Sequence, residues 1–174
     1  MNTATGRITI AIAPTSRGFG YAVFEQKDAL LDWGVKEART NKTRDSLLKL
    51  RVLMHLLQPA VMVVENTQDP RSRRSKRVSD LIEKMARLAK EKSVPVVRYP
   101  RNDVLAIFHR VGARNKDDIA AAIAKKLPEL APRVPPRRRI WESEHYNMAI
   151  FEAAALGLTY FARSEAQGRP TAPS

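Results

Sequence analysis

Two glutamates stand in surroundings where a carboxylate is costly, and both are candidates for metal-dependent chemistry. Glu65 directly follows an apolar run at residues 60–64, and Glu152 is the one acid in an otherwise apolar stretch at residues 149–158. An ionised carboxylate needs a partner, solvent or a bound ion when it is buried. Hydrolysis of phosphodiesters by Mg²⁺ or Mn²⁺ uses carboxylates that converge from different elements, so these two residues are the first candidates.

Each glutamate also has an ordinary structural explanation. Glu65 can point to solvent or cap the turn that follows its strand. Glu152 can form a buried ion pair with an arginine, because the chain contains 31 lysines and arginines. The residues alone leave both alternatives open.

The charge of the chain points to a polyanionic partner. The 174 residues include 31 Lys and Arg against 18 Asp and Glu, which gives a net charge of +13. Only 6% of the residues are aromatic, so phosphate contact is favoured over base stacking, and Trp33 and Trp141 are predicted to be packing residues. The basic residues form two clusters, which predict nucleic-acid binding by Arg71, Arg73, Arg74, Lys76, Arg77, Arg137, Arg138 and Arg139.

The composition excludes several other classes of protein. The absence of cysteine removes disulfides, cysteine zinc sites and thiol catalysis. No apolar run is long enough to span a bilayer, and the first residues lack the features of a signal peptide. We therefore expect a cytoplasmic protein that does not contact a membrane.

The predicted elements give an α/β fold with a central mixed five-stranded sheet flanked by helices. A basic loop at residues 71–77 precedes a helix whose Leu81, Met85 and Leu88 form an apolar stripe, which is core-facing by default and a possible dimer contact. Residues 1–6 are expected to be a lead, residues 7–162 one domain and residues 163–174 a flexible tail. The predicted strands are residues 7–13, 21–25, 30–36, 60–64 and 94–99, and the predicted helices are residues 43–57, 78–89, 102–110, 116–127 and 143–162, with a proline-containing connector at 130–139.

In these elements the chain resembles the RuvC family of Holliday-junction resolvases, which have an RNase H-like fold. Residues 12–17, followed by Gly20 and Tyr21, resemble the family's first strand and turn, usually I-D-P-G-S-R with G-Y. Glu65 closes the middle strand as the family's glutamate does. Residues 152–159 resemble the closing D-A-L-A-I-A-L-T helix. The order of the strand at 96–99, the glycine turn at 111–116 and the helix that follows also agrees, so the resemblance covers about residues 7–162.

The resemblance implies a catalytic site that this chain only partly retains. Ala13 stands at the position of the family's first aspartate, which is expected to bridge two metal ions. Ala149 stands where the family usually has another acid or a histidine. Glu65 and Glu152 remain as the implied catalytic residues, and as ligands of Mg²⁺ or Mn²⁺ if the protein is active. We therefore expect weakened or lost phosphodiester hydrolysis, with DNA binding retained.

Glu142, Glu144 and His145, at the start of the last predicted helix, are possible substitutes for the missing ligands. A continuous helix would separate Glu144 from Glu152 by about 12 Å at 1.5 Å per residue, too far for both to bind one ion. An acidic first turn is equally explained by the helix dipole, which is the role we expect for Glu142 and Glu144. His145 is expected to be a surface or capping residue.

The resemblance also implies a partner and an assembly. Lys116 resembles the family's DNA-contacting lysine, with a solvated residue near a helix start as the alternative, and Arg114 of the same turn is also predicted to bind nucleic acid. Arg17 is predicted either to approach a phosphate beside the site or simply to lie in a turn. Branched DNA is the implied substrate, and a homodimer is implied because a junction offers two symmetric cleavage points. Two alternatives stay open, an active junction endodeoxyribonuclease with rearranged ligands and a basic scaffold protein that binds RNA or a protein partner.

Overall fold

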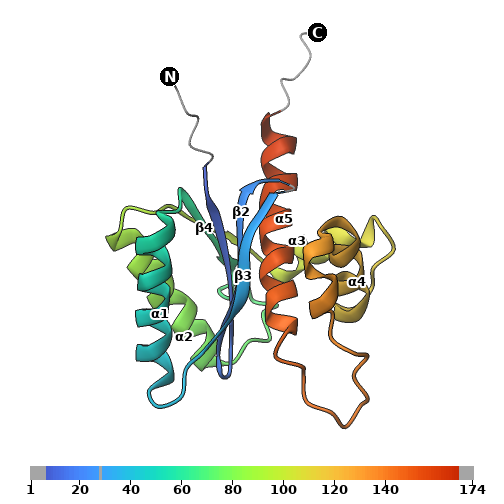
Figure 1. Ribbon diagram of the computed structural model, residues 1–174, viewed down its shortest axis with the longest axis horizontal. Coiled ribbons are helices and arrows are strands. Elements are labelled where there is room, and N and C mark those ends of the chain that lie inside the picture. The colour runs from blue at the N-terminus through green and yellow to red at the C-terminus, as the bar shows by residue number, and fades with distance from the viewer. Residues whose placement is uncertain (1–6, 28, 169–174) are drawn as a thin grey trace.

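The computed structural model describes residues 7–27 and 29–168, and these form a mixed sheet covered by helices on both faces (Figure 1). Within the described residues the sheet has five strands in the order β3-β2-β1-β4-β5. Strand β2 pairs antiparallel with both β1 and β3, whereas β4 pairs parallel with both β1 and β5. The predicted α/β architecture is confirmed. The strands are β1 (Thr9–Thr15), β2 (Gly18–Gln26), β3 (Ala29–Glu37), β4 (Val61–Glu65) and β5 (Val96–Tyr99).

Helices begin where polar caps satisfy their first amide groups. The side chains of Asn41, Ser75 and Asn115 accept hydrogen bonds from amides in the first turns of α1, α2 and α4. In Figure 1, α1 and α2 lie on one side of the sheet, and α3, α4 and α5 lie on the other. The helices are α1 (Lys42–Leu57), α2 (Lys76–Glu91), α3 (Arg101–His109), α4 (Lys116–Lys126) and α5 (Met148–Gly168), with a 3-10 helix at Pro128–Arg133.

Strand β1 separates two apolar cores because its side chains alternate between the two faces of the sheet. Ile10 and Ile12 pack with residues of α1 and α2. Ala11 and Ala13 lie on the opposite face, in the core that contains α5. Ala13 therefore faces the helix that carries Glu152.

Helix α5 lies unusually close to β2 because β2 has a glycine at the contact. A Cβ atom added at Gly20 would lie 2.4 Å from the backbone carbonyl of Ala149. Gly20 is also the cross-strand partner of Ala13. This close approach brings the first turns of α5 against the end of β1, where the predicted site lies.

Several predicted boundaries are wrong. Helix α2 begins at Lys76, so the basic segment predicted as one loop ends in a helical turn. Helix α5 begins at Met148 rather than at residue 143, because the amide of Met148 closes a turn onto the carbonyl of His145. It also continues past the predicted end at residue 162 to Gly168. The predicted connector at 130–139 overlaps the 3-10 helix, and the expected lead at 1–6 and the end of the tail lie outside the described residues.

The apolar stripe of α2 belongs to the core. Leu81, Met85 and Leu88 are at most 5% exposed and pack with residues of β1, β4 and α1. The default prediction for this stripe is confirmed, and the side chains are covered within one copy of the chain.

Candidate functional site

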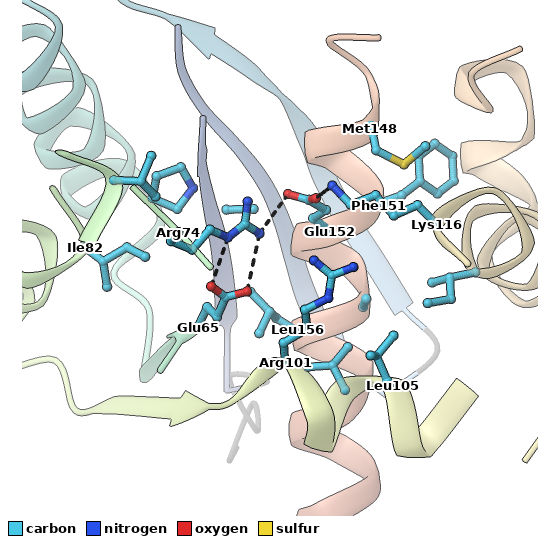
Figure 2. A pocket seen from close by; sticks show the side chains of 16 residues that line it. Glu65, Arg74, Ile82, Arg101, Leu105, Lys116, Met148, Phe151, Glu152 and Leu156 are labelled. Atoms are coloured by element: carbon cyan, nitrogen blue, oxygen red, sulfur yellow. Dashed lines mark hydrogen bonds and ion pairs between the residues drawn. The ribbon is translucent and has the colours of Figure 1, made fainter. Parts of the chain in front are cut away.

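The carboxyl ends of β1 and β4 meet one face of α5 at a small pocket (Figure 2). Parallel neighbouring strands end at the same edge of a sheet, which is where open α/β sheets bind ligands. Ala13 from β1, Glu65 from β4 and Glu152 from α5 all line this pocket. The side chains of Glu65 and Glu152 are only 13% and 15% exposed. The two glutamates predicted from the sequence are thus brought together.

A third side chain, Arg74, lies between the two carboxylates (Figure 2). Its Nε donates to Glu65 Oε2 at 2.9 Å, and its Nη2 donates to Glu65 Oε1 at 3.3 Å. The same Nη2 donates to Glu152 Oε2 at 3.4 Å. A guanidinium that binds one carboxylate with two nitrogens is held in a defined orientation. This interior position differs from the phosphate-binding role predicted for Arg74.

Lys116 neutralises the other side of Glu152. Its ammonium lies 2.6 Å from Glu152 Oε1 and 2.8 Å from Glu144 Oε2. Lys116 reaches this position because it is the first residue of α4, which Asn115 caps. The lysine that was predicted to contact DNA is therefore an ion-pair partner within the site.

The contact of Glu144 with Lys116 overturns one prediction. Residues 143–147 are not helical, so the expected helical separation of about 12 Å does not apply, and one ammonium contacts both Glu144 and Glu152. The helix-dipole explanation for Glu142 and Glu144 is also wrong, because α5 has no acidic residue in its first turn. His145 is exposed, which agrees with the surface alternative predicted for it, and its Nδ1 accepts a hydrogen bond from the amide of Asn147 at 3.2 Å.

The two cations keep Glu152 ionised. Burial raises the pKa of Glu152, but Arg74 and then Lys116 outweigh burial and lower it below its usual value. Burial likewise lowers the pKa of Arg74, but Glu152 and Glu65 raise it above its usual value. Glu152 and Arg74 are therefore both charged at neutral pH.

We expect this network to make folding stability fall in acid. A carboxyl whose pKa is lowered in the folded state stabilises the protein above its unfolded pKa of 4.5, and that stability is lost as the pH falls through the lower folded value. The free energies of unfolding in urea of the wild-type protein and Glu152→Gln should differ by about 2 kcal/mol at pH 7, and this difference should shrink as the pH falls below 4.5. Parallel curves for the two proteins across this range would contradict the ion-pair assignment.

The residues present do not fit the two metal ions that the resemblance implied. Mg²⁺ and Mn²⁺ sites take oxygen ligands, and neither Ala13 nor Ala149 supplies a side-chain oxygen. The guanidinium of Arg74 already joins Glu65 to Glu152. Across residues 7–27 and 29–168, no group of three or more His, Cys, Asp and Glu side chains is arranged to hold a metal ion.

A second hollow adjoins the site and is lined by arginines. It contains Arg71 and Arg73, and it shares Glu65, Arg74 and Arg101 with the first pocket. Arg71 pairs with Asp69 at 2.9 Å and lowers the pKa of that carboxyl to about 2. Sequence analysis missed Arg101. The available signal was its position two residues after the end of β5, since β5 ends beside β4 at the same edge of the sheet.

The other predicted nucleic-acid contacts lie in the turn between β1 and β2, around the start of α2, just before α4 and in the loop between the 3-10 helix and α5. Arg77 bonds the carbonyl of Ser16 at 3.2 Å, and Lys76 pairs with Asp80 along α2. Arg137 lies 3.7 Å from Asp118 and is 83% exposed. The side chains of the remaining predicted residues are exposed: Arg17, Arg73, Arg114, Arg138 and Arg139.

The two tryptophans differ. Trp33 is partly buried and packs against the core that contains α5, so its predicted packing role is confirmed. Trp141 is 77% exposed, so the packing role predicted for it is wrong. Trp141 lies in the loop of residues 134–147. Most of that loop was predicted to belong to the connector at 130–139 or to the helix at 143–162.

Solved structures with the same arrangement define the class of fold. The fold is RNase H-like, with the mixed sheet found in RuvC. Thermus thermophilus RuvC in complex with a Holliday junction substrate matches with a TM-score of 0.64 at 16% identity, over 94% of this chain and 99% of that chain. A further Thermus thermophilus RuvC structure matches with a TM-score of 0.62 at 20% identity, over 91% of this chain and 96% of that one.

The likeness extends to a eukaryotic resolvase. The yeast mitochondrial Holliday junction resolvase Ydc2 matches with a TM-score of 0.61 at 13% identity, over 94% of this chain and 80% of that chain. No family model and no curated protein matches the sequence. The chain is thus similar in structure to RuvC and Ydc2 over nearly its whole length, at low sequence identity.

Membrane insertion by a helix finds no support in the part of the chain that the structure describes. None of its helices combines the length and the apolar character needed to cross a bilayer.

Proposed function

We propose that this protein binds branched or otherwise structured DNA and lacks the metal-dependent hydrolysis associated with its fold. The observation that carries the proposal is the guanidinium of Arg74, which joins Glu65 and Glu152 at the end of β4. A cation built into the chain stands between the carboxylates that would otherwise be candidates for metal binding.

Charge supports the loss of hydrolysis. Three carboxylates, those of Glu65, Glu144 and Glu152, share two cations, Arg74 and Lys116. A divalent ion would have to displace a bidentate arginine from side chains that are mostly shielded from water, which costs more than displacing water molecules. Ala13 offers no carboxylate that could compensate for this cost.

Charge also supports DNA binding. The net charge is +13, and exposed arginines flank the site, among them Arg17, Arg73 and Arg101. Contacts of this kind position a phosphate backbone and give affinity that falls steeply with salt. One structure of the same fold contains RuvC in complex with a Holliday junction substrate, which makes branched DNA the substrate to test. A homodimer is proposed on the same resemblance.

The test is binding and cleavage of a synthetic four-way junction and of a duplex of the same sequence. We expect the protein to bind the junction more tightly than the duplex. We expect it to cut neither DNA in Mg²⁺ or Mn²⁺ at about 10 mM, a concentration high enough to fill weak metal sites. An Arg73→Gln/Arg101→Gln variant should weaken binding of both DNAs by about tenfold. Leu56→Ser, a change at an exposed residue of α1, is the matched control and should leave binding unchanged.

The other outcomes select the alternatives. Junction cutting by the unaltered protein would establish an active endonuclease with rearranged ligands, for which Glu144 would be the first candidate. Equal affinity for junction and duplex, with tighter binding of RNA, would support the scaffold alternative instead.

A further inference from the structure

The loop of residues 134–147, between the 3-10 helix and α5, presents apolar side chains to solvent. Ile140 is 98% exposed, Trp141 is 77% exposed and Tyr146 is 53% exposed. In Figure 1 the loop extends beyond the body of the domain at the end where α5 begins. Exposed apolar side chains that gather in one place commonly mark a binding surface.

The tip of this loop is a closed turn rather than an open strand of chain. The amide of Arg139 donates to Glu142 Oε2 at 3.0 Å, and the amide of Glu142 donates to the carbonyl of Arg139 at 3.0 Å. Ile140 and Trp141 are the two central residues of that turn. The turn therefore holds both side chains outward without covering them.

Ion pairs hold the base of the loop against the site described above. Glu144 lies 2.8 Å from Lys116, whose ammonium also contacts Glu152. Arg137, on the other arm of the loop, lies 3.7 Å from Asp118 of α4. Trp141 thus lies between two arms that contact α4, and one arm, through Glu144, reaches the lysine that pairs with Glu152.

The chemistry of the tip fits an unstacked nucleobase. The guanidinium of Arg139 lies over the Trp141 ring, 5.6 Å from the ring centroid. Arg137 and Arg138 are exposed directly before it, so cations that can bind phosphate precede an aromatic ring that can stack on a base. Bases inside a duplex have both faces covered by their neighbours, whereas bases at a branch point can leave the stack.

We propose that the 134–147 loop is a base-stacking arm, which places Trp141 on an unstacked base at the branch point while Arg137 and Arg138 bind the adjoining phosphates. The inference rests on the proposed function and deepens it, because it assigns the preference for branched DNA to one side chain. The arginines supply affinity for any DNA, and Trp141 supplies the discrimination between a junction and a duplex.

The test uses a four-way junction with 2-aminopurine at the branch point and a matched duplex with 2-aminopurine at its centre. Trp141→Leu keeps an apolar side chain and removes the indole, and Trp141→Phe keeps an aromatic ring. We expect Trp141→Leu to weaken junction binding by about tenfold and duplex binding by less than about twofold, and to abolish the change in 2-aminopurine fluorescence on binding. Trp141→Phe should stay within about threefold of the wild type.

Two comparison variants separate stacking from charge and from surface polarity. Arg138→Gln should weaken junction and duplex binding by the same factor, because a phosphate contact does not distinguish them. Leu56→Ser removes an equally exposed apolar side chain on α1 and should change neither affinity. Urea unfolding midpoints establish that Trp141→Leu is folded.

Three other outcomes would overturn the inference, and each shows whether the proposed function fails with it. If the wild type prefers the junction and Trp141→Leu keeps both that preference and the fluorescence change, the arm is refuted and the proposed function stands. If the wild type binds neither DNA, both fail together. If Trp141→Leu loses binding only to phosphatidylglycerol vesicles, the exposed loop serves a membrane surface instead.

Discussion

Replacing Ala13 with aspartate alone should leave the protein without tight Mn²⁺ binding, whereas the Ala13→Asp/Arg74→Ser double variant should bind Mn²⁺. Ala13 lines the pocket together with Glu65, Arg74 and Glu152. A carboxylate added there meets the Arg74 guanidinium, which already joins the two glutamates. The new aspartate therefore extends the ion-pair network until the arginine is removed.

The expected difference is large, because both variants hold three carboxylates around the same space, and only the double variant lacks the arginine cation that competes with a metal ion there. We expect the double variant to bind Mn²⁺ about 100-fold more tightly than Ala13→Asp, as measured by electron paramagnetic resonance titration. Ala13→Asp/Arg73→Ser is the matched control, since Arg73 lies in the same loop but is exposed. Equal Mn²⁺ affinity of Ala13→Asp and the double variant would show that Arg74 does not block the site.

Removing Arg74 should destabilise the fold by about 3 kcal/mol at pH 7. Arg74→Gln leaves Glu65 and Glu152, 13% and 15% exposed, as neighbouring charges with Lys116 as the remaining cation beside Glu152. Loss of one partner of a buried ion pair costs about 3–5 kcal/mol, and the partial exposure of this network places the expected cost at the lower end. Urea unfolding at pH 7 measures it.

A second arginine provides the comparison for this prediction. Arg98 pairs with Glu83, but the two side chains are 30% and 39% exposed, so Arg98→Gln should cost less than about 1 kcal/mol. Adding Glu65→Gln to Arg74→Gln should restore about half of the lost stability, because the unpaired carboxylate is removed. A cost of Arg74→Gln no larger than that of Arg98→Gln would mean that the bridge contributes little.

Most of the architecture could be predicted from the sequence, because the apolar patterns that mark strands and helices coincide with the residues that are buried in the fold. Apolar runs bounded by turn residues located the strands, and the stripe of α2 located its buried face. The start of α5 could not be predicted from apolar periodicity. That start depends on backbone turns in which the carbonyls of His145 and Tyr146 accept hydrogen bonds, and such turns leave no periodic pattern in the sequence. That error hid the loop that carries Trp141 and gave Glu144 a helical position it does not have.

The sequence by itself determined which carboxylates are out of place. Glu65 and Glu152 are conspicuous because an acid among apolar residues must have a partner, and Ala13 is conspicuous through the family motif it interrupts. Only the tertiary structure decided which of 31 lysines and arginines supply that partner. Arg74 and Lys116 are 78 and 36 positions from Glu152 in the chain (152 − 74 and 152 − 116). They meet it because the segment between β4 and α2, the start of α4 and the first turns of α5 come together at one edge of the sheet. Sequence spacing carries no information about such contacts, which depend on how the chain packs.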